Sequence, residues 1–149
     1  RQEYGVRDDR MFILEVAMKK PSISVLPDPA IRLLHHSKER LQFPKGLKVA
    51  ATNYYHLQIY KIILGRLAED GELTSRRRKA ACKVLWPLAR WIAKTDVGEA
   101  CELARWIHQL DPDFKPPENG LLGHLYRRVG FRRTEKILAL RRQLLATLH

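Results

Sequence analysis

The stretch "TSRRRKAACKVLWPLARWIAKTDVGEACELARWIHQLDP", residues 74–112, decides the fold of this chain. Its apolar residues recur every three or four positions, which is typical of helices that bury one face. Thr74 or Ser75 can cap a first helix that runs to about Lys94. Thr95 or Asp96 can cap a second helix over residues 97–110, whose buried face would hold Ala100, Leu103, Ala104 and Ile107. The stretch therefore predicts two helices joined by a short turn.

Three tryptophans and both cysteines of the chain fall within this helical pattern. We expect Trp86, Trp91 and Trp106 in the core because they sit at helical spacing. Pro87 cannot donate a backbone hydrogen bond, so we expect a kink or a restart of the helix near Trp86. Cys82 and Cys101 lack the spacing of a zinc site, and we expect them to be small core residues in a reducing compartment, the cytoplasm.

The second of these helices carries a resemblance of its own. The run "GEACELARWIHQLDPDFKPP", residues 98–117, resembles the second helix of a tetratricopeptide-type hairpin, with residues 75–94 as its partner. A clean repeat of about 34 residues does not follow. Further helices are predicted over residues 47–68, 119–129 and 131–147, with the last two separated at Gly130. Residues 44–149 therefore predict a helical extension, a bundle or hairpin array of about five helices.

The beginning of the chain has a different character. Residues 8–19 have helical spacing, "SISVL" at residues 22–26 alternates like a strand, and residues 30–34 suggest a second short strand. A helix with one or two strands cannot form a domain alone. We therefore expect residues 1–37 to be a short α/β remnant, the end of a larger sheet domain, in an otherwise mainly α chain.

Residues 3–37 contain the runs "RDDRMFILEVA", "SISVLPDP" and "IRLLHHS" in this order. Together these runs resemble the end of the catalytic domain of family-2 glycosyltransferases. The family opens a helix with an acidic pair in the pattern D-x-x-[FL]-x-L-x-x-A, and Asp9, Phe12, Leu14 and Ala17 fall on these positions. Asp8 replaces the glutamate that is usual before this aspartate. Pro27 and Pro29 fall on the turn that follows the strand.

The resemblance implies transfer of a sugar, with inversion, from a nucleotide-diphosphate donor to a hydroxyl of a saccharide or lipid-linked acceptor. Asp9 would be the general base, with Asp8 beside it, and His36 or His35 would lie near the donor diphosphate. Arg32 would face a phosphate or solvent. A divalent metal, Mg²⁺ or Mn²⁺, would be held mostly by residues outside this chain, so the fragment alone would be inactive. Spacing alone favours a structural role for Asp8 and Asp9, as a helix cap and a first-turn acid, over a catalytic one.

The charge of the chain supports a second hypothesis of a different class. Lys and Arg total 28 against 16 Asp and Glu, a net charge of +12 over 149 residues. The basic runs are "SRRRK" (75–79), "YRRVGFRR" (126–133) and "LRRQ" (140–143). They can be solvated helix faces, or they can dock on an anionic membrane through apolar residues such as Phe131, Leu144 and Leu148. The alternative function is therefore a non-catalytic basic helical module that binds a protein partner or an anionic surface.

Nucleic acid is an unlikely partner on the sequence alone. Tyr126 and Phe131 neighbour arginines, which is compatible with base stacking, but no signature of a nucleic-acid-binding fold accompanies them. The "DPD" run at residues 111–113 follows a helix instead of a strand, so we do not expect it to hold a metal.

Overall fold

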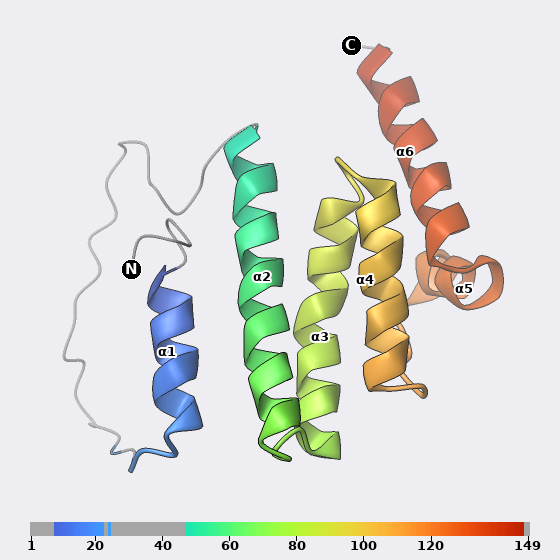
Figure 1. Cartoon of the computed structure of the whole chain (residues 1–149). Helices are drawn as coiled ribbons and strands as arrows, with labels where there is room; N and C mark the ends of the chain where they lie inside the picture. The colour runs from blue at the N-terminus through green and yellow to red at the C-terminus, as the bar shows by residue number, and fades with distance from the viewer. Residues whose placement is uncertain (1–7, 23, 25–46, 148–149) are drawn as a thin grey trace.

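The structure of the chain, a computed structural model, describes residues 8–22, 24 and 47–147. Within these residues the chain forms six helices and no strand. The helices are α1 (Asp8–Met18), α2 (Leu47–Glu69), α3 (Ser75–Ile92), α4 (Val97–Leu110), α5 (Gly120–Val129) and α6 (Phe131–Thr147). Helices α1 to α4 lie side by side, and α5 lies across the start of α6 (Figure 1). The prediction of a helical part with about five helices after the first is confirmed.

Helices α3 and α4 form the antiparallel pair at the centre of the array (Figure 1). Thr74 is the N-cap of α3, and its hydroxyl accepts the backbone N–H of Arg77 at 3.4 Å. Asp96 is the N-cap of α4, and its carboxylate accepts the backbone N–H of Glu99 at 2.9 Å. The predicted hairpin and its caps are therefore confirmed, because each cap satisfies a backbone donor that the first turn leaves free.

The restart predicted near Trp86 is not seen, because α3 runs through Pro87 as a single helix. Leu85 and Trp86 before the proline and Leu88 and Ala89 after it are all buried in one core. This continuous packing outweighs the loss of about 3 kcal/mol that a proline costs a helix interior. Pro87 itself lies on an exposed part of the helix.

The main core lies where α2, α3, α4 and α5 meet. All four residues predicted for the buried face of α4 are less than 6% exposed, so the predicted face is confirmed. Aromatic side chains close the core around Trp86, whose ring centre lies 5.1 Å from that of Tyr126 and 5.3 Å from that of Phe131. The buried members of this cluster include Leu57, Leu64, Cys82, Leu85, Trp86, Ala89, Ile92, Ala100, Leu103, Ile107 and Tyr126.

The tryptophans and cysteines differ in burial. Trp86 is buried and Trp106 packs against the core, as predicted, but Trp91 is 52% exposed and its prediction as a core residue is wrong. Trp91 lies on the outer side of α3, where the Lys94 ammonium sits 5.0 Å from its ring centre. Cys82 is buried and Cys101 is half-buried, and both are free thiols.

Helix α1 packs against α2 and runs in the same direction (Figure 1). Met11 is buried between the two helices together with Ile59 and Ile63. Two ion pairs border this contact: Glu15 with Arg66 at 3.2 Å, and Lys20 with Glu72 at 2.8 Å. The helix predicted over residues 8–19 is therefore confirmed, and it belongs to the same packed array as the helical extension.

The short α/β remnant predicted for the beginning of the chain is not seen. Ser22 and Ser24 follow α1 in irregular backbone, although both lie in the strand predicted over residues 22–26. A strand needs partner strands for its backbone donors and acceptors, and none is present in the described part of the chain. The second predicted strand, residues 30–34, lies outside the described residues. The division into domains at residues 1–37 and 44–149 stays a prediction.

Candidate functional site

The predicted catalytic pair lies at the start of α1. Asp8 is the first residue of the helix, and Asp9 is exposed in its first turn. Oδ1 of Asp9 accepts the backbone N–H of Arg10 at 2.7 Å. An acid in a first helical turn interacts favourably with the positive end of the helix dipole. The position therefore suits a first-turn acid that stabilises the helix, and it also leaves Asp9 accessible to a ligand from solvent.

The other predicted site residues are Arg32, His35 and His36. All three lie outside the described residues, so their approach to Asp9 stays a prediction. Of the predicted site, the structure thus describes the position of Asp8 and Asp9 only.

A groove of about 310 Å³ lies between α1, α2 and α3, and Asp9 is not among its lining residues. Arg10 lines it from α1, Asn53 and Tyr60 line it from α2, and Pro87 and Trp91 line it from α3. This set combines aromatic faces with an amide and a guanidinium group, which can stack on a ligand and hydrogen-bond to it. The groove was not predicted from the sequence, because Trp91 was expected in the core. The sequence does contain one indication of the groove: Asn53 and Tyr60 lie two helical turns apart and therefore share one face of α2.

The groove continues into an apolar channel of about 300 Å³ along the same three helices. Tyr60 and Val84 line both parts. The apolar part is lined further by Leu14, Ala17, Met18, Ile63, Leu64, Leu67, Ala80 and Ala81. It offers mainly packing surface, and its polar side chains are those of Tyr60 and Arg77.

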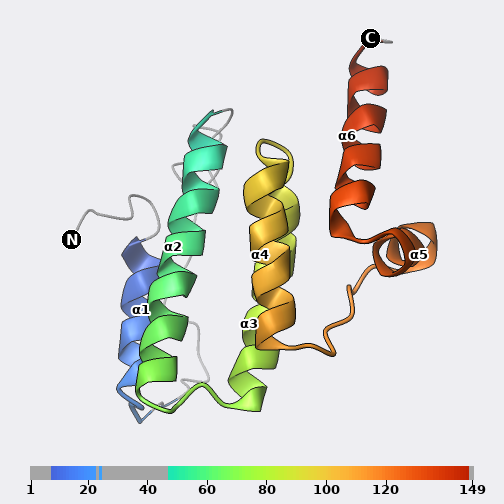
Figure 2. The same ribbon diagram turned by 45° about the vertical axis from the view of Figure 1, so that its right-hand side comes forward.

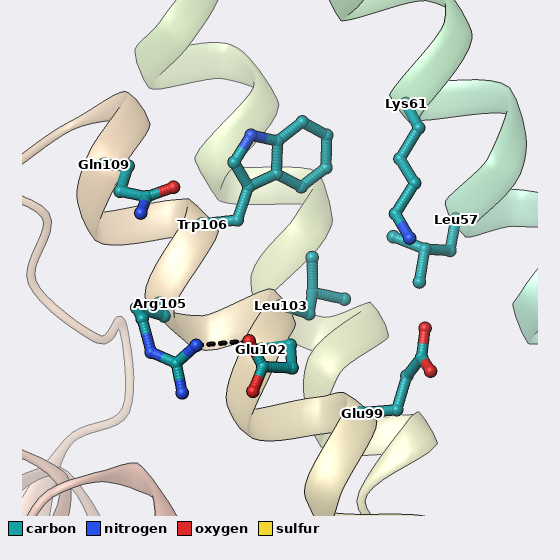
Figure 3. A pocket seen from close by; sticks show the side chains of 8 residues that line it. All are labelled: Leu57, Lys61, Glu99, Glu102, Leu103, Arg105, Trp106 and Gln109. Atoms are coloured by element: carbon teal, nitrogen blue, oxygen red, sulfur yellow. Dashed lines mark hydrogen bonds and ion pairs between the residues drawn. The ribbon is translucent and has the colours of Figure 1, made fainter.

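Figure 3 shows a second groove, of about 320 Å³, between α2 and α4. Lys61 reaches into it from α2, and Glu99, Glu102, Arg105 and Trp106 line it from α4. Arg105 and Glu102 are paired with each other. The groove therefore carries balanced charge and no buried ionisable group, which makes it a poor candidate for catalysis.

A third and larger cleft, about 640 Å³, separates α4 from α6. Arg105 and His108 line it from α4, and Arg132 and Lys136 line it from α6, so positive charge dominates. Glu102, the acid among its lining residues, is paired with Arg105. This cleft suits an anionic ligand.

Cys101 also lines the cleft between α4 and α6. Burial raises the pKa of its thiol, so it is protonated at neutral pH and is a poor nucleophile. The same holds for Cys82 in the core, where burial raises the thiol pKa to about 11. The two cysteines are therefore structural residues in this fold.

A network of polar side chains is buried where α3, α5 and α6 meet. Arg90 donates to Glu118 at 2.6 Å, and its Nε lies 3.6 Å from Glu135, which is 1% exposed. The Tyr126 hydroxyl donates to Glu135. Burial, and then the bond to Glu135, raise the pKa of Tyr126. Nε of Arg90 makes no hydrogen bond, but the other contacts of the network tie α3 to the loop before α5 and to α5, and α5 to α6.

The burial of Tyr126 also bears on whether its ring can stack on nucleic-acid bases. Tyr126 is 4% exposed, and Phe131 packs with it against Trp86. The ring of Tyr126 is therefore not accessible to a base, whereas Phe131 is half-buried and lines the cleft between α4 and α6.

The described residues give a divalent metal no ligand set. Among residues 8–22, 24 and 47–147, no three His, Cys, Asp or Glu side chains come together as metal ligands would. The metal that the family resemblance implies therefore does not fit this part of the chain.

Two surfaces thus remain as candidates: the groove between α1, α2 and α3 for a polar organic ligand, and the cleft between α4 and α6 for an anion. None of the six described helices has both the length and the apolar character needed to cross a bilayer. No family model, no curated protein and no solved structure matches this chain.

Proposed function

We propose that this chain is the C-terminal part of a family-2-like glycosyltransferase, in which Asp9 is the general base. The donor nucleotide would be bound by a sheet domain that precedes α1. The observation that carries the proposal is the surface of α1. Besides the resemblance of residues 3–37, this helix has an apolar face that nothing in the described part of the chain covers.

Helix α1 is apolar on two opposite sides. Met11, Leu14 and Met18 pack toward α2. On the other side Phe12 is 66% exposed, Ile13 is 63% exposed and Val16 is 41% exposed. A helix that is apolar all round is typical of a position between two layers. The helical array supplies one layer, and the proposed transferase domain would supply the second.

The proposed chemistry needs one carboxylate at this place. The acceptor hydroxyl gives its proton to Asp9 while its oxygen bonds to the anomeric carbon of the donor sugar from the face opposite the nucleoside diphosphate, which leaves with the electrons of its own bond. Proton transfer of this kind contributes about 100- to 10,000-fold to a rate.

The test is an Asp9→Asn substitution in the protein as its native source makes it. Release of nucleoside diphosphate from a panel of UDP-, GDP- and dTDP-sugars should fall by about 100-fold or more, because the amide cannot accept the proton. Binding of the donor should change by less than about twofold, since Asp9 acts on the acceptor. Asp113→Asn, a change of another exposed aspartate, is the matched control.

Two results would contradict the proposal. Turnover that survives Asp9→Asn would remove Asp9 as the base. A native protein with a mass near 17.4 kDa, without a further domain of about 100–200 residues, would leave the reaction without a donor site.

The second candidate is the non-catalytic basic helical module, favoured by the positive cleft between α4 and α6. A module of this kind would be a cooperative monomer on its own. A severed transferase end would instead expose Phe12 and Ile13 and self-associate through them. Sedimentation of the 149-residue chain distinguishes the two hypotheses. A monomer is expected for the module, and an oligomer that Phe12→Ser dissociates is expected for the severed transferase end.

A further inference from the structure

Helix α6 carries an apolar stripe on the side that faces away from the body. Its inner side is packed: Thr134 and Glu135 are buried, and Phe131 contacts the core. On the outer side Ile137 is 45% exposed, Leu140 is 61% exposed and Leu144 is 65% exposed. Steps of three and four residues place these three side chains in one line along the helix.

The stripe is accessible because the end of α6 extends past the other helices. Figures 1 and 2, which differ by a rotation, both show the C-terminal turns of α6 beyond the tops of α2 and α4. Leu145, which is 49% exposed, belongs to these same turns. Solvent-facing leucines on the free part of a helix are typical of a surface that docks on something.

Positive charge borders the stripe on both sides. At about 100° per residue, Lys136 lies about 70° to one side of the stripe and Arg141 about 70° to the other. Arg133 precedes Ile137 by one turn, and all three cations are exposed. Among the acids of α6, Glu135 faces inward and is buried with Tyr126 and Arg90. The outer face of α6 therefore presents apolar and basic side chains and no acidic one.

The cleft between α4 and α6 extends this positive surface. Lys136 both borders the stripe and lines the cleft, where Arg105, His108 and Arg132 join it. A bound anion there would lie next to the apolar stripe. An apolar stripe beside a basic cleft is complementary to an anionic lipid bilayer, in which acyl chains lie beneath negatively charged headgroups.

We propose that α6 docks this protein on an anionic membrane, with Ile137, Leu140 and Leu144 entering the acyl boundary and Lys136 and Arg141 contacting headgroups. A second copy of the chain is a poor occupant, because pairing two α6 helices would bring their cations together. The proposal does not depend on the transferase activity proposed above.

The experiment measures binding of the 149-residue chain to vesicles. One set is phosphatidylcholine alone, and the other contains phosphatidylglycerol as about one third of the lipid. We expect partition into the anionic vesicles and at least about tenfold weaker partition into the neutral ones. Leu140→Ser combined with Leu144→Ser should lower the partition coefficient by about tenfold or more. Lys136→Gln combined with Arg141→Gln should lower it about fivefold for each charge removed.

Matched control variants distinguish docking by α6 from non-specific binding to the vesicles. Leu121→Ser on α5 and Phe12→Ser on α1 remove equally exposed apolar residues elsewhere, and Arg76→Gln with Arg78→Gln removes two exposed charges from α3. Each control should leave partition within about twofold, because charges beyond about 10 Å from the membrane are screened.

The proposal is overturned if the chain stays in solution with both vesicle types or binds both equally. It is also overturned if any control weakens binding as much as the α6 variants do. Binding of inorganic phosphate or duplex RNA without vesicle binding would assign the basic surface to a different anion and would likewise reject membrane docking. Circular dichroism of each variant confirms that the helices are intact.

Discussion

The indole N–H of Trp86 donates to the carboxylate of Glu118, with Nε1 2.9 Å from Oε1 and 3.0 Å from Oε2. Trp86 is in the middle of α3, and Glu118 belongs to the loop that leads into α5. The same carboxylate accepts from Arg90 at 2.6 Å. One side chain of the loop therefore satisfies two donors of α3, and it fixes where the C-terminal helices α5 and α6 attach to the array.

Glu118→Ala should destabilise the protein by about 2–3 kcal/mol. The substitution leaves the buried indole N–H of Trp86 and the guanidinium of Arg90 without this acceptor, and each unsatisfied group costs about 1–3 kcal/mol. Urea unfolding followed by circular dichroism measures the change. Glu102→Ala, which removes an exposed partner of Arg105, should cost less than about 0.5 kcal/mol. Equal losses for the two variants would show that the Glu118 contacts are not the cause.

Tyr126→Phe should make the protein less sensitive to base. Burial and the bond to Glu135 raise the pKa of Tyr126 in the folded state. The unfolded chain releases this proton near pH 10, while the folded state keeps it, so stability falls as the pH rises above about 10. Without the hydroxyl, this part of the decline should disappear from melting temperatures measured between neutral pH and pH 11. Tyr55→Phe, a change of a 39% exposed tyrosine, should keep the decline.

The same substitution should cost about 1–2 kcal/mol at neutral pH. It leaves the buried carboxylate of Glu135 with Arg90 but without the hydroxyl donor. A neutral effect at pH 7 would mean that another donor replaces the hydroxyl of Tyr126.

Gly123→Ala should be strongly destabilising, although alanine is the better helix former. A Cβ at Gly123 would lie 1.9 Å from the backbone carbonyl oxygen of Glu118, so either α5 or the loop must move. Gly65 in α2 has no atom within 4 Å of the same position, and Gly65→Ala should stabilise the protein by about 0.5–1 kcal/mol. Thermal unfolding of the two variants should therefore shift in opposite directions. A shift of both in the same direction would contradict the close approach of the loop to α5.

Local signals explain what the sequence predicted correctly. Thr74 and Asp96 indicate where α3 and α4 begin, because the side-chain oxygen of an N-cap residue lies directly before the first helical turn. Gly130 separates α5 from α6 with a positive φ of 83°, which other residues rarely adopt. The buried face of α4 follows from spacing alone. These features depend on a few neighbouring residues, so the sequence is sufficient for them.

The wrong or missing predictions depend on tertiary contacts. Trp91 has helical spacing, but it lines the open groove between α1, α2 and α3 and stays half exposed. A kink or a restart was expected at Pro87, but Trp86 and Leu88 on either side of it are buried in one core, and α3 does not restart there. The groove between α1, α2 and α3 draws its walls from three helices, so no single run of sequence contains it. The same limit applies to Arg32, His35 and His36, whose place relative to Asp9 depends on contacts beyond the described residues.

Truncating two neighbouring side chains of α1 should have different effects on the stability of the 149-residue chain. Met11 is 6% exposed against α2, so Met11→Ala should cost the 149-residue chain about 2 kcal/mol. Phe12 is 66% exposed, so Phe12→Ser should change its stability by less than about 0.5 kcal/mol. In the longer protein that we propose, a transferase domain would cover Phe12, and the same substitution should cost about 3 kcal/mol. Unfolding of both proteins with each substitution measures the difference. If Phe12→Ser is harmless in the native protein as well, the apolar face of α1 has another purpose, and the structural support for a preceding sheet domain is lost.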